Sequence, residues 1–114
     1  MSTNFRPLTP AERAIIEKLF EAEFPGRDEL RLQLKSAVAK QLLQDGTLEL
    51  RCLEGPAAPV KFRLAVEGYM TDSDGVPIFV MLFADRGYMS LLEIAKADGS
   101  QIIDMPTAAT ITVS

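Results

Sequence analysis

The stretch Val76-Pro77-Ile78-Phe79-Val80-Met81-Leu82-Phe83-Ala84 decides the fold of this protein. Every residue in it is apolar, and successive side chains of a strand project to opposite faces of a sheet. A continuous apolar run is therefore typical of a central β-strand with both faces covered. Pro77 is compatible with this assignment because it stands at the beginning of the run, where a missing N–H is tolerated. The remaining chain is expected to surround this strand.

Residues on either side of this run predict further strands. Residues 47–53 and 60–67 alternate with a period of two, and the short loop between them predicts a β-hairpin. Their expected inward side chains are Leu48, Leu50, Cys52, Val60, Phe62, Leu64 and Val66. Another strand is expected at 89–97 and a short one at 101–104. The uncharged, β-prone segment 107–114 is expected to form either an edge strand or a flexible end.

Two amphipathic helices are predicted before the strands. Thr9-Pro10-Ala11-Glu12 matches a capping box, and Phe24-Pro25-Gly26 ends the helix that follows. A second helix is expected over residues 28–44, because Leu30, Leu34, Val38 and Leu42 recur every four residues. The prediction is an α+β fold with two N-terminal helices packed on one face of an antiparallel, four- to five-stranded meander sheet.

Composition indicates an ordinary globular domain. The chain has 114 residues, with 47% hydrophobic and 25% charged, so a single domain over 1–114 is expected, with a core at about 8–106 and extended or flexible ends at 1–7 and 107–114. The net charge of −4 argues against binding to nucleic acid. No apolar segment is long enough to cross a membrane. The first residues do not resemble a signal peptide, and a single cysteine forms no intrachain disulfide, so a cytoplasmic location is expected.

The absence of histidine narrows the possible chemistry. The chain lacks the commonest general base and the commonest transition-metal ligand, and one cysteine is too few for a zinc site. Ser-His-Asp and Cys-His catalysis is excluded. We therefore expect no cofactor and no metal. Chemistry based on carboxylate, lysine or tyrosine groups stays open, although a non-enzymatic role is favoured.

Three polar or reactive features have simpler structural explanations. Residues 72–75, Asp-Ser-Asp-Gly, lack the remaining ligands of an EF-hand loop and are predicted to be a hairpin turn. Glu93 and Lys96 are three residues apart, so they are expected on opposite faces of a strand and not in a metal-dependent nuclease site. Cys52 lies on the apolar face of its strand and is expected to pack in the core.

The central strand leaves one apolar face unexplained. If the helices cover the other face, Phe79, Met81 and Phe83 project outward, and Tyr69 and Leu91 extend the same patch. Large exposed apolar patches usually mark an interface or a ligand groove. We predict that this face mediates homodimerisation or binding to another protein. The alternative is that the C-terminal tail folds over it.

A second hypothesis assigns the sheet face to a small molecule. Arg51, Arg63 and Glu67, together with Tyr69, would then surround a ligand or substrate. A deep pocket where these polar groups converge would support this hypothesis.

Several of these residues also match a known family pattern. They are Leu8-Thr9, Phe24-Pro25-Gly26-Arg27, Leu30, Leu34, Asp45-Gly46-Thr47-Leu48, residues 72–78, Leu92-Glu93-Ile94, Lys96, Asp98-Gly99 and Ile102. From about Leu8 to Pro106, the chain resembles an uncharacterised bacterial family of small stand-alone proteins whose domain has no known function. The resemblance implies a compact bacterial α+β protein and provides no catalytic residues to transfer.

Overall fold

A seven-stranded antiparallel sheet dominates the fold in the computed structural model, which describes residues 5–60 and 63–113. The strand order is β1-β2-β3-β6-β5-β4-β7, and two helices accompany the sheet within the described residues. The strands are β1 (Arg6–Pro7), β2 (Ala37–Gln41), β3 (Leu48–Cys52), β4 (Leu64–Thr71), β5 (Pro77–Asp85), β6 (Tyr88–Lys96) and β7 (Thr112–Val113). The α+β prediction is confirmed, but the predicted number of four to five strands is wrong.

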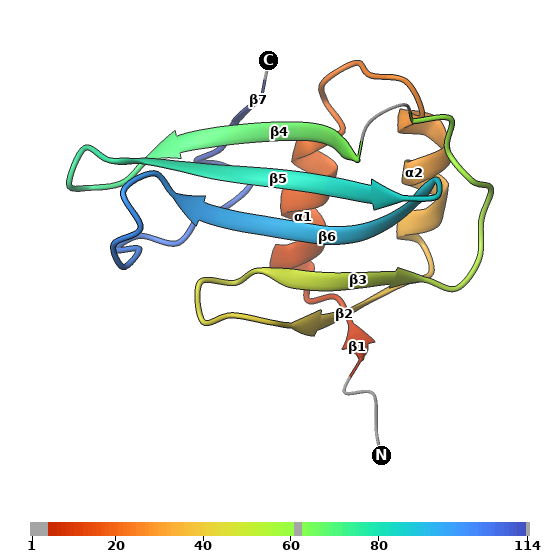
Figure 1. Ribbon diagram of the computed structural model, residues 1–114, viewed down its shortest axis with the longest axis horizontal. Helices are drawn as coiled ribbons and strands as arrows, with labels where there is room; N and C mark the ends of the chain where they lie inside the picture. The colour runs from red at the N-terminus through yellow and green to blue at the C-terminus, as the bar shows by residue number, and fades with distance from the viewer. Residues whose placement is uncertain (1–4, 61–62, 114) are drawn as a thin grey trace.

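Both helices lie on the same side of the sheet (Figure 1). Helix α1 (Pro10–Leu19) begins at the predicted capping box: the Thr9 hydroxyl accepts the Glu12 N–H at 3.1 Å, and the Glu12 carboxylate accepts the Thr9 N–H at 2.9 Å. Helix α1 ends at Leu19, earlier than the predicted stop at Phe24-Pro25-Gly26, and helix α2 (Arg27–Leu34) begins directly after Gly26. Their apolar stripes form the core against the inner face of the sheet, with Ile16, Leu19 and Leu30 fully buried.

The second half of the predicted second helix is a strand. Helix α2 ends at Leu34, and β2 begins at Ala37. Ala37 and Ala39 are buried in alternation, whereas Leu42, expected in the helical stripe, is 46% exposed. The apolar positions of this segment fit the spacing of a helix as well as that of a strand. As a strand, the segment gains backbone pairing to β1 and β3 on its two sides. Tertiary pairing therefore decides between the two structures.

The predicted hairpin between residues 47–53 and 60–67 is also wrong. Strand β3 pairs with β2 and β6, whereas β4 pairs with β5 and β7. The connection of residues 42–47 pairs β3 with β2 on one side, and β6 occupies its other side. Strand β4 therefore lies beyond β6 and β5 in the sheet. A bulge between Leu64 and Val66 leaves Leu64 38% exposed, contrary to its predicted inward position. The predicted inward Phe62 lies outside the described residues.

The end of the chain forms the last edge strand. β7 pairs with β4 through Gly68 and Val113, as the edge-strand alternative predicted, and Ile111 is buried. A side chain at Gly68 would lie 2.6 Å from Ile111 Cγ2 and 3.1 Å from Leu19 Cδ2. The described part of the tail therefore packs on the helix side of the sheet and does not cover the outer face. Residues 101–104, predicted as a short strand, form none.

One buried amide joins three separate segments. Gln33 of α2 is fully buried, and its Nε2 donates to the Pro56 and Gly87 carbonyls at 2.7 and 2.8 Å. Its Oε1 accepts the Met89 N–H at 3.0 Å. All the polar atoms of the amide are thus satisfied, as burial requires. Gln33 fixes the end of α2 to the long connection and to the turn between β5 and β6.

None of the helices within residues 5–60 and 63–113 is both long enough and apolar enough to cross a membrane.

Candidate functional site

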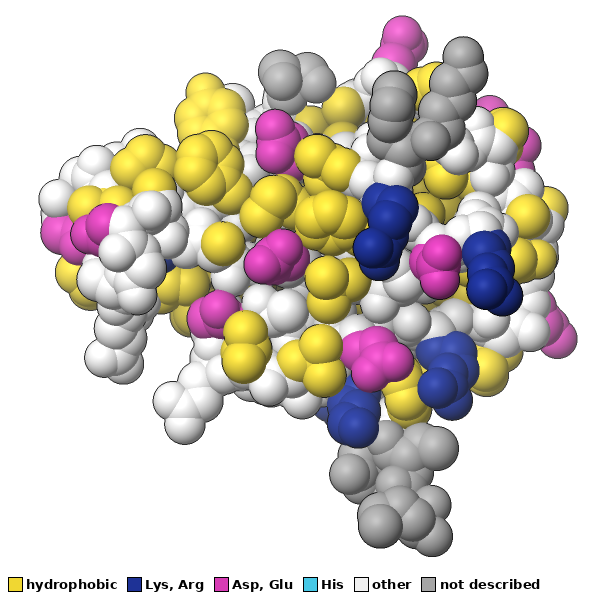
Figure 2. Space-filling view, in the orientation of Figure 1, with side chains coloured by type: hydrophobic (Ala, Val, Ile, Leu, Met, Phe, Trp, Pro, Cys, Tyr) yellow, Lys and Arg dark blue, Asp and Glu magenta, His cyan; other side chains and the backbone are white. Residues whose placement is uncertain are grey.

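The five residues predicted to form an interface lie together on the outer face of the sheet. The strand register places Tyr69 of β4 beside Phe79 of β5, and Phe83 beside Leu91 of β6. Met81 lies between these two pairs along β5. Figure 2 shows apolar side chains gathered over β4, β5 and β6 on the side facing away from the helices. We call these five residues and Leu64 the outer patch.

The outer patch is exposed at its rim and partly covered at its centre. Tyr69 is 49% exposed, and Phe79 and Leu64 are each 38% exposed. Met81, Phe83 and Leu91 are half-buried by their neighbours on the same face. Leu64 was missed from sequence because the bulge that turns it outward has no clear local signal. The patch thus has the apolar character that interfaces require.

Acidic and basic side chains lie at different places around the outer patch. Glu67 of β4 and Glu93 of β6 lie on either side of Met81 in the strand register. Arg63 precedes β4 at the other end of the patch, where its carbonyl accepts the Ala84 N–H at 2.7 Å. Among the described residues, these three side chains make no ion pair. The outer face therefore has an acidic part and a basic end.

The residues of the small-molecule hypothesis do not converge. Arg51 lies on β3 and Glu67 on β4, three strand spacings apart, which corresponds to about 14 Å across the sheet. Arg51 instead stacks on Phe5, with its guanidinium carbon 4.2 Å from the ring centre. Arg63 is exposed before β4. The structure thus places these residues on one broad face without bringing them around a common cavity.

Cys52 occupies the structural position expected from sequence. It lies opposite Ala37 at the end of β3, half-buried against the core. Burial raises the pKa of its thiol to about 11, and a hydrogen bond from the backbone at Met89 opposes this increase only in part. The thiolate is the nucleophilic form of cysteine, so this environment disfavours the reactive form of Cys52.

A buried charge cluster joins the β4–β5 turn to β6. The Lys96 Nζ donates to Asp72 at 2.8 Å, to Asp74 at 2.7 Å and to the Gln101 carbonyl at 3.2 Å. The Asp72 carboxylate also accepts the backbone N–H groups of Ser73, Ile103 and Asp104. Both charged side chains of the central pair are at most 1% exposed. All three protons of the ammonium group are thus used within the protein.

The cluster includes residues of the two acidic motifs singled out from sequence. Residues 72–75 form the predicted hairpin turn, in which Gly75 donates to the Asp72 carbonyl at 2.9 Å. Lys96 is buried on the inner side while Glu93 lies on the outer face, as their spacing predicts. Within residues 5–60 and 63–113, no group of three or more potential ligands is arranged to hold a metal ion. The cluster therefore anchors the loop after β6.

Hydrogen bonding determines the ionisation of the cluster. Burial alone would raise the pKa of Asp72, but the bonds from Lys96 and the backbone amides outweigh it and hold this pKa well below its usual range. Burial alone would lower the pKa of Lys96, whereas the bonds to Asp72 and Asp74 raise it above its ordinary value. Both groups consequently remain charged at neutral pH.

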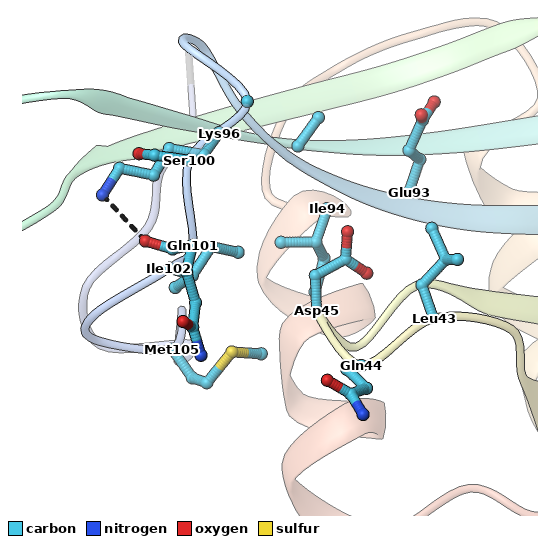
Figure 3. A pocket seen from close by; sticks show the side chains of 12 residues that line it. Leu43, Gln44, Asp45, Glu93, Ile94, Lys96, Ser100, Gln101, Ile102 and Met105 are labelled. Carbon is cyan, nitrogen blue, oxygen red and sulfur yellow. Dashed lines mark hydrogen bonds between the residues drawn. The ribbon is translucent and has the colours of Figure 1, made fainter.

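A groove of about 540 Å³ lies beside this cluster (Figure 3). It is bounded by residues 43–45 after β2, by residues 93–96 of β6 and by the loop at 99–105. Lys96 lines it but turns toward Gln101, whereas Met105, on the same loop as Gln101, extends across the groove toward Gln44 and Ile94. The groove was not predicted, because residues 43–45 on one side are distant in sequence from residues 93–105 on the other.

Comparison with known families gives one match. The family model described as "Domain of unknown function (DUF6984)" covers residues 5–106 of the chain. No curated protein and no solved structure matches the chain.

Proposed function

The chain belongs to the DUF6984 family of domains of unknown function, and we propose that it is a non-enzymatic interaction module that forms a homodimer through the outer patch. The observation that carries this proposal is the exposure of Tyr69 and Phe79 side by side on a sheet face that neither the helices nor the tail covers. Burying these aromatic side chains would contribute much of the association free energy.

The distribution of charge favours a second copy as the partner. Arg63 lies at the basic end of the outer face, directly before β4, and Glu67 lies in its acidic part on β4. When two copies pack face to face about a two-fold axis that crosses the strands between Arg63 and Glu67, the basic end of each copy approaches the acidic part of the other. A two-fold interface requires this kind of self-complementary surface.

Sedimentation equilibrium of the full chain tests the proposal. We expect the wild type to dimerise with rising concentration and Phe79→Asp to remain monomeric, because the substitution places a charge within the apolar interface. Leu32→Asp is a matched control, since Leu32 is 48% exposed on α2, away from the outer face. A wild type that is monomeric at every concentration would contradict the proposal, as would a Phe79→Asp variant that associates normally.

A charge exchange tests the geometry of the dimer. Arg63→Glu should weaken association, because it places like charges near each other, and Arg63→Glu combined with Glu67→Arg should restore it. If the double variant associates no better than either single variant, the two-fold arrangement is wrong even when the patch itself is correct.

The setting proposed for this dimer is the bacterial cytoplasm. The presence of a single cysteine, which forms no intrachain disulfide, supports a reducing compartment. Fractionation of the native host would check this location.

A further inference from the structure

The groove beside β6 exists because β3 stops pairing before β6 ends. The last pair toward the groove joins Leu48 and Leu92. Beyond it, the Thr47 hydroxyl accepts the Ile94 N–H at 3.1 Å and bonds to the Ile94 carbonyl at 3.4 Å. Thr47 thus occupies the N–H and carbonyl of Ile94, which an added strand would otherwise pair with. A ligand in the groove is therefore recognised by side chains.

The groove combines an apolar surface with acidic side chains. Ile94 and Ile102 form its inner part, and the more exposed Leu43 and Met105 form its walls. Asp45 and Glu93 add two carboxylates. A ligand that fits this surface carries a positive charge next to an apolar group.

Lys96 does not neutralise these carboxylates. Its ammonium group is saturated by Asp72, Asp74 and the Gln101 carbonyl, so it offers no donor to the groove. Asp72 and Asp74 together exceed its single charge. The positive charge complementary to Asp45 and Glu93 must therefore come from the ligand.

Further exposed apolar side chains are adjacent in sequence to residues that line the groove. Leu42 precedes Leu43 and Ile103 follows Ile102, and they are 46% and 59% exposed. An extended chain segment would cover these side chains, whereas a small amine would not. This favours a macromolecular ligand.

We propose that this groove binds a segment of a partner protein in which lysine or arginine alternates with large apolar residues. The basic side chains approach Asp45 and Glu93, and the apolar ones contact Leu43, Ile94 and Met105. The two surfaces share Glu93 at their border, but their apolar centres differ, because the outer patch centres on Met81 and the groove on Ile94.

Methionine methyl groups provide separate reporters of the two surfaces. Met105 lies in the groove and Met81 on the outer patch, so methyl-¹³C methionine labelling followed by NMR distinguishes them. The probe is acetyl-Leu-Lys-Leu-Arg-Leu-amide, with acetyl-Leu-Glu-Leu-Glu-Leu-amide as its acidic counterpart. We expect saturable shifts of the Met105 signal with the basic peptide and none with the acidic one.

Charge-neutralising variants test the groove directly. Asp45→Asn retains an oxygen that accepts the Thr47 N–H, and combining it with Glu93→Gln should weaken basic-peptide binding about threefold to tenfold. Glu54→Gln, exposed and far from the groove, should have no effect. An unshifted Met105 signal, equal binding of both peptides, or an unaffected double variant would overturn the proposal. Hexylamine binding as tightly as the peptide would also overturn it. Shifts of the Met81 methyl signal that depend on protein concentration report the dimer separately.

Discussion

The ammonium nitrogen of Lys96 lies 2.8 Å from a carboxylate oxygen of Asp72, and neither side chain is more than 1% exposed. A buried charge is stable only while its partner is present. This pair connects the β4–β5 turn to β6, and through Asp72 it also connects to the amides of Ile103 and Asp104. The loop that forms one wall of the groove therefore depends on it.

Removing the lysine should strongly destabilise the protein. We expect Lys96→Met to lower the free energy of unfolding by about 3–5 kcal/mol, because it leaves Asp72 buried without its cation. Urea denaturation measures this change. Lys18→Met is the control, since the ion pair of Lys18 with Glu21 is partly exposed and worth at most about 1 kcal/mol. Equal effects of the two substitutions would show that the buried pair has no special role.

Acid should weaken the fold through Asp72 and Glu12. The hydrogen bond from Arg6 is the main cause that lowers the pKa of Glu12, and the pKa of Asp72 is held well below its usual value of 3.8. A lowered folded-state pKa gives stability that is complete above the unfolded-state pKa and decreases as the pH falls below it. The urea midpoint should therefore be insensitive to these groups from pH 7 to about 5 and fall below about pH 4.

Glu12→Gln should remove part of this dependence of the urea midpoint on acid.

The raised pKa of Lys96 acts in the opposite direction of pH. Its contribution to stability is complete below the ordinary pKa of 10.5 and is lost only above it. A loss of stability between pH 7 and 10 that Lys96 accounts for would contradict this assignment.

A methyl group at Gly68 should displace the C-terminal edge strand. A Cβ there would lie 2.6 Å from Ile111 Cγ2 and 3.0 Å from the Thr112 carbonyl oxygen. We expect Gly68→Ala to lower the free energy of unfolding by about 1–3 kcal/mol through overpacking. Because Ile111→Ala removes the nearest clashing atom, the double variant should lose less than the sum of the single variants. Additive losses in urea denaturation would place the strain elsewhere.

Cys52 should react slowly while the protein is folded. With its pKa raised to about 11 from an ordinary 9.0, its thiolate fraction at pH 8 is on the order of 100-fold lower than that of an unperturbed thiol. Alkylation by iodoacetamide, followed by mass spectrometry, should accelerate by a similar factor in urea. Equally rapid labelling in the folded state would contradict the buried environment.

Local sequence signals predicted individual caps and turns better than they predicted which strands pair with each other. The capping box at Thr9 and the turn at 72–75 depend on a few adjacent residues, and both are present. Segment 37–41 is different, because its apolar spacing suits a helix as well as a strand, and only pairing with β1 and β3 selects the strand. The order of the strands depends on contacts between Leu48 and Leu92, which no local pattern specifies.

The same distinction applies to the surfaces. The outer patch was predictable because alternation along one strand places Phe79, Met81 and Phe83 on one face. The charge cluster and the groove combine distant segments and were missed. One signal was available: Lys96 continues the inward positions of Leu92 and Ile94, and a lysine at such a position needs a carboxylate partner.

The position of β3 beside β6 also has a consequence during synthesis. A ribosome that has made the chain only through β5 has released the β2–β3 hairpin without the neighbour that later covers its edge. Strand edges without a neighbour pair readily with other chains. Translation therefore passes through an interval, ending when residues around Leu92 emerge, in which the nascent protein is most prone to aggregate.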